Sequence, residues 1–409
     1  MTTSSSGKLH FDVWDGSIEP LVPREGSTFE YDISSAAQLA GLAAQGTYPA
    51  SNTYTLTTNI DLNEIEWTPI GGNVSARFEG TFDGDGHTIT GLNLADNQTR
   101  TGLFGYLGPV AGTWTVVENL TVELSDNGGF INNTTVSNAG ALAGEIANTQ
   151  LDNISVKGEL NIKSSVTTLR VGGISGLLGN AQIFNSVSNV NVKCETTHAS
   201  GEAQAGGLAG YSSASSARIS SCYSTGNVTA IGVSGATAGG ITGYNSPTIT
   251  SCYTTGNIHA NAGNANAGGI AGMNTSAPIQ ASYAHGDVKA TATGTANSGG
   301  IVGNLSSGTI ERCAALNNNI SGAGSKTARI AGNLAGTATN NAANIDMLVN
   351  SSIVINSNKD GFGINPALLT ESIYTGTGTL TETSGVITGG LGWDSNVWDF
   401  TSRYPKLIQ

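Results

Sequence analysis

The residues best suited to chemistry are two aspartates, Asp83 and Asp85, in the segment Asp-Gly-Asp-Gly-His. Carboxylates separated by glycine supply oxygen ligands on a flexible backbone, so the pair is a candidate Ca²⁺ site. The glutamate that completes an EF-hand loop does not follow, and Asp-Gly pairs also form ordinary tight turns between strands. We favour the turn, keep Ca²⁺ as the alternative and expect no other cofactor.

Three tyrosines, Tyr223, Tyr253 and Tyr283, occupy the same position of three similar segments, SCYSTGNV, SCYTTGNI and ASYAHGDV. An aromatic ring gives a large contact area at low entropy cost, so such a row could bind sugar rings or a partner protein. The alternative is a stack of rings that only stabilises the edge of the fold. We favour the stabilising stack and keep the three tyrosines as candidate binding residues.

Catalytic motifs are missing, and no catalytic residue is assigned. A zinc peptidase needs His-Glu-x-x-His, and none of the five histidines is followed by glutamate. Polysaccharide hydrolases need paired carboxylates, and the central hundred residues have too few charges to form them. The charged residues between 201 and 300 are Glu202, Arg218, Asp287 and Lys289. The sequence therefore predicts a protein that is not an enzyme.

Three of the four cysteines, Cys222, Cys252 and Cys313, share one position of the repeating segments, and Cys194 lies apart. There is no Cys-x-x-Cys pair, which is the usual spacing of metal ligands. Residues stacked on parallel strands lie ~4.8 Å apart with their Cβ vectors side by side, a poor start for a disulfide. We expect free, buried thiols that act as small apolar side chains.

These residues belong to a repeating unit. Glycine-rich hexapeptides such as AGGLAG end at Gly144, Gly176, Gly210, Gly243, Gly272 and Gly303, and related segments end at Gly105 and Gly332, at intervals of 29 to 39 residues. Within a unit, apolar residues alternate in short runs separated by glycine or asparagine, and helical spacing is absent. Coils of about 30 residues with three short strands predict a right-handed parallel β-helix, an all-β fold.

Composition excludes several other classes. The chain has 57 glycines in 409 residues without a three-residue period, and 38% of its residues are hydrophobic, so it is neither collagen nor a disordered chain. The net charge is -13, and the 16 Lys and Arg residues are scattered, which argues against a nucleic-acid partner. The sequence contains no run of 18 apolar residues, so it predicts no transmembrane segment.

The two ends differ from the repeats. Ser34 or Ser35 can begin a helix over Ala36, Leu39, Ala40 and Ala43 that Gly46 ends, and this helix suits an N-terminal cap. The aromatic residues near the other end predict a lid over the last coil: Trp393, Trp398, Phe400 and Tyr404. We expect one continuous domain with a tail at 1–30, a capping helix and first coils at 31–130, repeats at 131–340 and last coils with the C-terminal cap at 341–409.

The repeats resemble the GLUG-motif proteins. The resemblance lies in TGLFG at Thr101 to Gly105, in the Gly-Gly-apolar-x-Gly units, and in opening segments such as NIDL and WTPIG. It implies a bacterial cell-surface protein of adhesin-like type, as in Bacteroides and its relatives. It also implies a likeness to the non-catalytic regions of some immunoglobulin A peptidases.

We therefore expect a non-enzymatic, monomeric, secreted or surface-attached adhesin-like β-helix whose loops bind a glycan or a surface protein. The alternatives are a carbohydrate-active β-helix enzyme, an accessory region of a larger surface peptidase, or a structural stalk. The first residues, MTTSSSGKLH, lack the apolar stretch of a signal peptide. We expect an extracellular or outer-membrane location, with a signal or lipoprotein anchor removed ahead of this segment.

Overall fold

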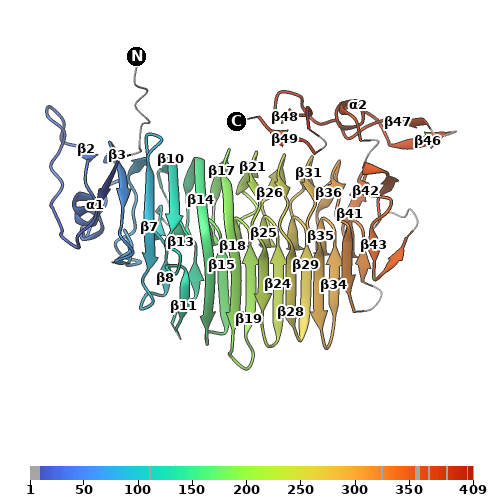
Figure 1. Ribbon diagram of the computed structural model, residues 1–409, viewed down its shortest axis with the longest axis horizontal. Coiled ribbons are helices and arrows are strands. Elements are labelled where there is room, and N and C mark those ends of the chain that lie inside the picture. Colours follow the sequence, from blue (N-terminus) through green and yellow to red (C-terminus); the bar gives the residue numbers. More distant parts are fainter. Residues whose placement is uncertain are drawn as a thin grey trace, which may run out of the picture.

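The computed structural model describes residues 10–109, 112–133, 135–323, 326–354, 360–366, 369–383, 386–402 and 404–408. It is a parallel β-solenoid of about nine turns with ~32-residue coils, with 51% strand and 4% helix (Figure 1). The predicted all-β, parallel β-helix is confirmed. The first nine residues of the predicted tail lie outside the described residues.

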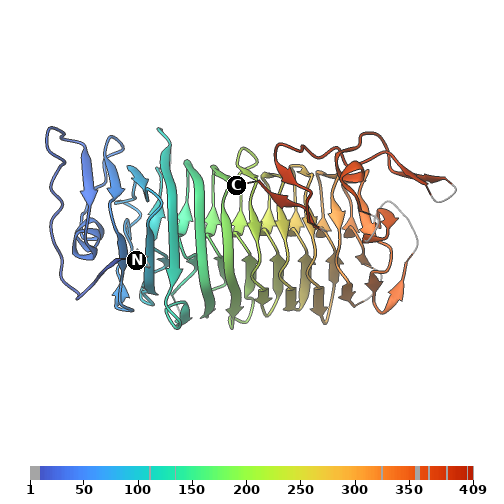
Figure 2. The same cartoon turned by 45° about the horizontal axis from the view of Figure 1, so that its top comes forward.

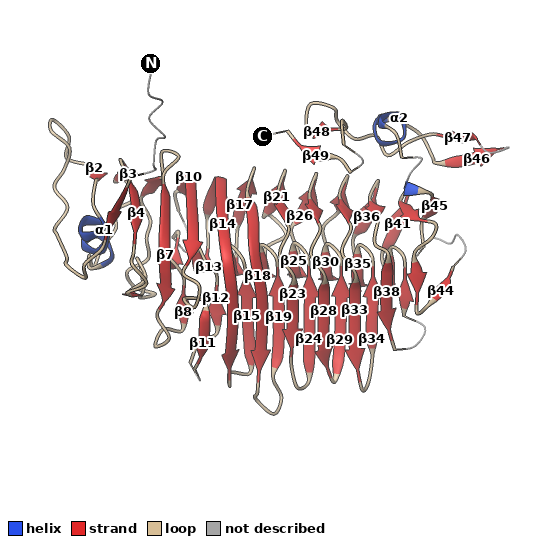
Figure 3. Ribbon diagram, in the orientation of Figure 1, coloured by secondary structure: helices blue, strands red, loops and turns tan. Residues whose placement is uncertain are grey.

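Three parallel sheets run along the solenoid (Figure 3). In the described part of the chain the main sheet has 29 strands, and two lateral sheets have eight strands each.

The strands of the main sheet are β1 (Phe11–Val13), β2 (Glu30–Ile33), β3 (Thr53–Leu56), β4 (Asn59–Asp61), β5 (Glu66–Trp67), β6 (Thr81–Asp83), β7 (Thr88–Leu94), β10 (Thr115–Leu124), β11 (Phe130–Asn132), β14 (Thr149–Ser164), β17 (Ala181–Phe184), β18 (Val187–Thr196), β21 (Arg218–Ser220), β22 (Tyr223–Ser224), β23 (Val228–Ile231), β26 (Thr248–Thr250), β27 (Tyr253–Thr254), β28 (Ile258–Ala262), β31 (Ile279–Gln280), β32 (Tyr283–Ala284), β33 (Val288–Ala292), β36 (Thr309–Glu311), β37 (Ala314–Ala315), β38 (Asn319–Gly322), β41 (Thr337–Thr339), β42 (Ala342–Asn344), β43 (Leu348–Val349), β44 (Ser352–Ile353) and β45 (Phe362–Ile364). The first lateral sheet comprises β8 (Arg100–Thr101), β12 (Asn138–Ala139), β15 (Thr168–Gly172), β19 (Glu202–Gly206), β24 (Gly235–Gly239), β29 (Asn264–Gly268), β34 (Ala296–Gly299) and β39 (Thr327–Ala328). The second lateral sheet comprises β9 (Phe104–Leu107), β13 (Ala143–Ile146), β16 (Ser175–Leu178), β20 (Ala209–Ser212), β25 (Thr242–Asn245), β30 (Ala271–Asn274), β35 (Val302–Leu305) and β40 (Ala331–Leu334).

The glycine-rich hexapeptide forms the corner between the two lateral sheets. A Cβ atom on Gly239 would lie 2.0 Å from the carbonyl oxygen of Thr242, and one on Gly268 would lie 2.0 Å from that of Ala271. Only glycine allows so close an approach of backbone to backbone. The apolar residue between the glycines, for example Ile241, is fully buried in the core. The repeat is therefore explained by a corner too tight for any side chain.

A second corner of the coil has a column of left-handed residues that the sequence does not reveal. Its members have φ angles between 46° and 55° and follow the coils in order: Asn119, Asn153, Asn185, Ser221, Ser251, Ala281, Arg312 and Asn340. Asparagine tolerates this conformation better than most residues, and its side chain bonds along the column. Asn153 Nδ2 donates to Asn119 Oδ1 at 3.0 Å. The corner is fixed by its backbone shape, because its residue types vary.

The N-terminal helix α1 (Ala36–Ala43) begins at Ser35, whose hydroxyl accepts a hydrogen bond from the backbone N–H of Gln38 at 3.2 Å. Its buried face includes Leu39 and Leu42, which join the solenoid core. The predicted helix is confirmed, and it ends three residues before Gly46. No helix in the described part of the chain is long and apolar enough to cross a membrane.

The aromatic C-terminal segment corrects one expectation. Residues 369–408, here named the strap, include the short helix α2 (Glu371–Thr375) and two antiparallel pairs, β46 (Thr381–Thr383) with β47 (Val386–Thr388) and β48 (Trp398–Asp399) with β49 (Lys406–Leu407). The strap turns back along the flank of the solenoid, and the chain ends near its middle (Figures 1 and 2). The aromatic residues thus form a lid over the flank of several coils and not over the last coil.

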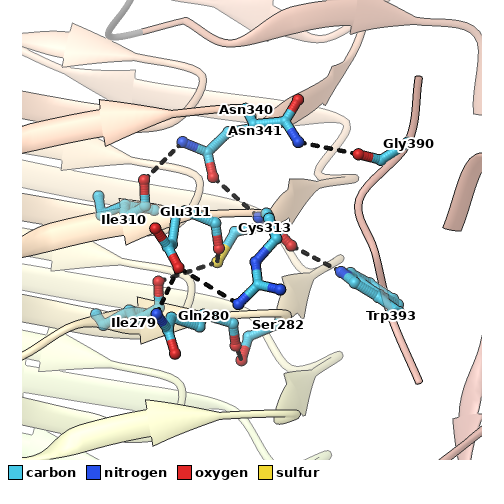
Figure 4. Close-up of polar contacts among 11 residues, drawn as sticks. Ile279, Gln280, Ser282, Ile310, Glu311, Cys313, Asn340, Asn341, Gly390 and Trp393 are labelled. Atoms are coloured by element: carbon cyan, nitrogen blue, oxygen red, sulfur yellow. Dashed lines mark hydrogen bonds and ion pairs between the residues drawn. The ribbon is translucent and has the colours of Figure 1, made fainter. Parts of the chain in front are cut away.

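Polar bonds to the left-handed column hold the strap in place (Figure 4). The indole N–H of Trp393 donates to the backbone oxygen of Arg312 at 2.7 Å, and Asn340 Nδ2 donates to the backbone oxygen of Gly390 at 2.9 Å. Residues in this left-handed conformation therefore provide the attachment points of the strap on the flank.

Candidate functional site: a groove between the lateral sheets

The structure places Asp83 and Asp85 in a tight turn. Asp83 Oδ1 accepts hydrogen bonds from the backbone N–H of Asp85 at 2.9 Å and from Asn119 Nδ2 at 3.2 Å, and Asp85 has a left-handed φ of 47°. Among the described residues, no group of three or more His, Cys, Asp or Glu side chains could hold a metal ion. The geometry supports the turn, and Ca²⁺ binding stays a prediction that no contact favours.

The three predicted tyrosines do stack. The ring centroids of Tyr223 and Tyr253 lie 4.6 Å apart, and those of Tyr253 and Tyr283 lie 5.1 Å apart, with nearly parallel planes. The strap covers Tyr253, which is 8% exposed, and Tyr283, which is 2% exposed. Burial raises the pKa of both phenols. These two rings cannot meet a ligand while the strap is in place.

Tyr223 lies at the N-terminal end of this stack. It lines a hollow of about 510 Å³ together with Val187, Asn189 and the end of the strap at Leu407. Of the three candidate binding residues, Tyr223 alone borders a space that a ligand could enter. Its binding role stays a prediction.

The cysteines have the predicted state. All four are free and buried. In the shared position, Cys252 Sγ donates to the backbone oxygen of Thr250 at 3.2 Å, and the hydroxyl of Ser282 makes the equivalent bond to Gln280 at 2.7 Å. Burial raises the pKa of the Cys313 thiol to about 12, so it stays protonated and unreactive at neutral pH.

A different set of side chains lines a groove at the corner between the two lateral sheets. Its hollow measures about 350 Å³, and we name it the corner groove. Gln204, Thr237 and Asn266 come from the first lateral sheet, and Tyr244 and Met273 come from the second. Its sides are thus amide, hydroxyl and aromatic, with Glu202 exposed at the rim. This lining can donate and accept several hydrogen bonds to one ligand.

Tyr244 lines the hollow, and its ring stacks on that of Tyr211. Tyr211 and Tyr244 are in register on β20 and β25, and their ring centroids lie 4.7 Å apart. The Cζ atom of Arg170 lies 4.8 Å from the centroid of the Tyr211 ring, and Arg170 Nε donates to Gln204 Oε1 at 3.0 Å. Tyr211 is therefore held between a guanidinium and a second ring. In this stack of Arg170, Tyr211 and Tyr244, the Tyr244 ring forms the aromatic wall of the hollow.

The same corner is charged toward the N-terminus. Glu145 forms ion pairs with Arg77 at 3.0 Å and with Arg100 at 3.2 Å. Both guanidinium groups lie over the ring of Tyr106, at 5.0 Å and 5.3 Å from its centroid. Glu145 is thus held between two cations and is a poor candidate for a general base.

Sequence reasoning missed this groove, although a signal was available. The residue that directly follows the last glycine of each hexapeptide is the one that faces outward at this corner. In chain order these residues are Tyr106, Glu145, Leu177, Tyr211, Tyr244, Met273, Asn304 and Asn333. The residue type at this position varies from coil to coil, which makes this corner the surface most able to discriminate between ligands.

Fold and site together define a class, a parallel β-solenoid built from glycine-rich repeats with a polar and aromatic corner groove. The family model of the GLUG motif matches residues 201–229, so the chain contains a GLUG repeat, as the resemblance implied. The matched residues include the Gly-Gly corner of one coil together with Gln204 and Tyr211.

Two known proteins are similar to this chain. Halomucin of Haloquadratum walsbyi (strain DSM 16790 / HBSQ001) is 31% identical over 189 residues, which cover 43% of this chain and 2% of halomucin. The chain thus spans a small part of that relative's length. A solved protein of Bacteroides ovatus, described as a candidate immunoglobulin A1 protease, is 21% identical with a TM-score of 0.47 over 92% of each chain.

Proposed function

We propose that this protein is a non-enzymatic, adhesin-like β-solenoid that binds a glycan in its corner groove. The observation behind the proposal is the lining of the hollow, where Gln204, Thr237 and Asn266 stand opposite Tyr244. Amides and hydroxyls pair with sugar hydroxyl groups, and an aromatic ring contacts the apolar edge of a sugar ring.

The shape of the surface also favours an extended ligand. Coils in register repeat the same positions every ~4.8 Å along the axis, so polar groups line the corner at regular steps. Asn297 Nδ2 donates to Asn266 Oδ1 at 2.7 Å, and Asn333 Nδ2 donates to Asn304 Oδ1 at 2.8 Å. These bonds hold the amides in fixed orientations, which lowers the entropy cost of binding. A linear oligosaccharide fits this arrangement better than a compact molecule does.

A binding role without catalysis is supported by the state of the nearby carboxylates. Glu145 is paired with two arginines, and Glu202 is exposed at the rim. Neither forms the close carboxylate pair of a glycosidase. The GLUG repeat supports a location at the cell surface or outside the cell, and we propose a monomer.

A blocking substitution tests the proposal. Thr237→Trp on β24 would fill the corner groove, whereas Thr229→Trp on β23 of the same coil places an equal bulk on the main sheet. We expect oligosaccharide binding on a glycan array, confirmed by calorimetry, for the native protein and for Thr229→Trp. Thr237→Trp should lose binding while its melting temperature stays close to native. Equal binding by both variants, or cleavage of a bound glycan, would contradict the proposal.

A further inference from the structure

Arg170 differs from the other arginines of the corner. Its neighbours on β15, Leu169 and Val171, are fully buried in the core, so its own side chain points outward. Arg77 and Arg100 share the carboxylate of Glu145, but Arg170 has no ion pair with a carboxylate among the described residues. Its Nε is engaged with Gln204, and no described residue accepts from its two terminal amino groups.

The surroundings of this guanidinium are arranged for an anion. The Tyr211 ring holds one face of its plane, and Gln204 fixes one edge. Burial lowers the pKa of Arg170, and the positive charge of Arg100 adds to that effect, whereas Tyr211, Glu145 and Glu202 act against it. Arginine nonetheless stays charged at neutral pH. A cation that has lost part of its water and makes no direct ion pair with a described residue is where an anionic ligand gains most.

We infer that the corner groove binds an acidic glycan and that Arg170 binds the carboxylate of one of its sugars. This inference rests on the proposed function. A guanidinium recognises a carboxylate through two parallel N–H donors, and the two terminal amino groups of Arg170 provide them. Gln204 joins the two parts of the site, because it contacts Arg170 and also lines the hollow. Tyr244, Thr237 and Asn266 then bind the hydroxyl groups of adjoining sugars.

The charge of the protein narrows the ligand class. The chain has a net charge of -13, and Glu202 stands at the rim of the groove. A densely charged polymer would be repelled, whereas a glycan with one carboxylate near Arg170 gains a strong bond at one point. Uronic acids and sialic acids both have this chemistry.

Matched ligand pairs test the inference. Calorimetry would compare an oligosaccharide that contains a single uronic acid with its methyl ester, and sialyllactose with lactose, against the native protein, Arg170→Gln and Arg170→Lys. The control is Arg218→Gln, which removes one exposed positive charge from β21 on the main sheet. Far-ultraviolet circular dichroism and melting curves would confirm that each variant is folded. A glutamate hexapeptide serves as an acidic ligand that is not a sugar.

We expect the acidic member of at least one pair to bind roughly tenfold to a hundredfold more tightly than its neutral partner. Arg170→Gln should lose that preference, Arg170→Lys should lose part of it, and Arg218→Gln should keep it. The sugar pair that shows the preference identifies uronate or sialate as the ligand. Equal binding of acidic and neutral sugars, unchanged in Arg170→Gln, overturns the inference and leaves the proposed function standing. Binding of the hexapeptide alone, or of no probe, overturns both.

Discussion

The solenoid has two columns of stacked tyrosines, and they differ in whether another segment of the chain covers them. Tyr223, Tyr253 and Tyr283 stack on the main sheet, and the strap covers Tyr253 and Tyr283 with Trp393 and Trp398. Tyr211 and Tyr244 stack on the second lateral sheet and stay half-buried beside an open hollow.

The two columns use the same stacking geometry, because any residue type repeated in register on parallel strands forms a ladder. What separates them is the cover. The strap converts the first column into a small second core, whose members include Tyr253, Tyr283, Trp393 and Trp398. The second column has no such cover among the described residues, and Tyr244 shares its hollow with the polar side chains of Gln204, Thr237 and Asn266. The in-register repeats form both ladders of tyrosine rings, and the strap, which is not part of the repeats, determines which ladder stays accessible to a ligand.

The largest effect is expected from removing the centre of the strap. Trp398 is 1% exposed and packs on Tyr253, Tyr283 and Trp393. Trp398→Ala should lower the free energy of unfolding of the strap by about 3–5 kcal/mol, since it deletes a large buried ring. Limited proteolysis should then cut within residues 369–408, and chemical denaturation should show a separate early transition.

The control is Trp114→Ala, because Trp114 is 41% exposed and lies outside both columns. It should change stability by less than about 1 kcal/mol. If Trp398→Ala leaves the strap as resistant to protease as the native protein, the strap is not held by this cluster and the comparison of the two columns fails.

A smaller effect is expected at the glycine that follows the covered column. A Cβ on Gly256 would lie 1.9 Å from the backbone oxygen of Gly226 in the preceding coil. Gly256→Ala should therefore force the coils apart and cost about 1–3 kcal/mol of unfolding free energy, measured by urea titration. Gly46→Ala is the control, because nothing lies within 4 Å of its Cβ position. Equal stability of the two variants would show that coil stacking tolerates a side chain there.

The ionisation and reactivity of the buried thiols distinguish unfolding of the strap from unfolding of the solenoid. Cys313 belongs to the solenoid core and not to the cluster beneath the strap. Its thiol has a pKa of about 12 when folded, against an ordinary 9.0. The unfolded chain thus releases a proton above pH 9 that the folded chain keeps. Stability from this group is complete below pH 9 and is lost as the pH rises toward 12, by about 1.4 kcal/mol per pH unit.

Urea titrations at pH 8 and pH 10 check this slope, with Cys313→Ser as the comparison. The native protein should lose more stability between the two pH values than Cys313→Ser does. At pH 8 a thiol reagent should react with neither the native protein nor Trp398→Ala before the solenoid unfolds. Rapid labelling of Trp398→Ala would mean that the strap and the coils unfold together.

The sequence predicts the fold because the fold depends on short-range features. The period of the hexapeptide and its glycines set the corner, and Ser35 sets the helix that begins the solenoid. The position of the strap could not be predicted, because Trp393 and Trp398 would be buried equally well over the last coil or over the flank. Their actual place depends on bonds to Arg312 and Asn340, whose left-handed backbone is not marked by any shared residue type.

The candidate site could be predicted only in part. The recurrence of tyrosine in one position correctly indicates a stack, but recurrence does not tell whether the stack is covered. The corner groove depends on side chains from two sheets, Gln204 on β19 and Tyr244 on β25, which are 40 positions apart in the chain. Their meeting is a result of the glycine corner and becomes visible only once the coils are closed.

The most direct test compares one tyrosine from each column. Tyr244→Ala and Tyr253→Ala would be measured side by side for oligosaccharide affinity by calorimetry and for melting temperature. We expect Tyr244→Ala to lose roughly tenfold or more in affinity with little change in melting temperature. Tyr253→Ala should keep its affinity and melt at a lower temperature with an early loss of the strap. Loss of binding in Tyr253→Ala together with native binding in Tyr244→Ala would contradict ligand binding in the corner groove.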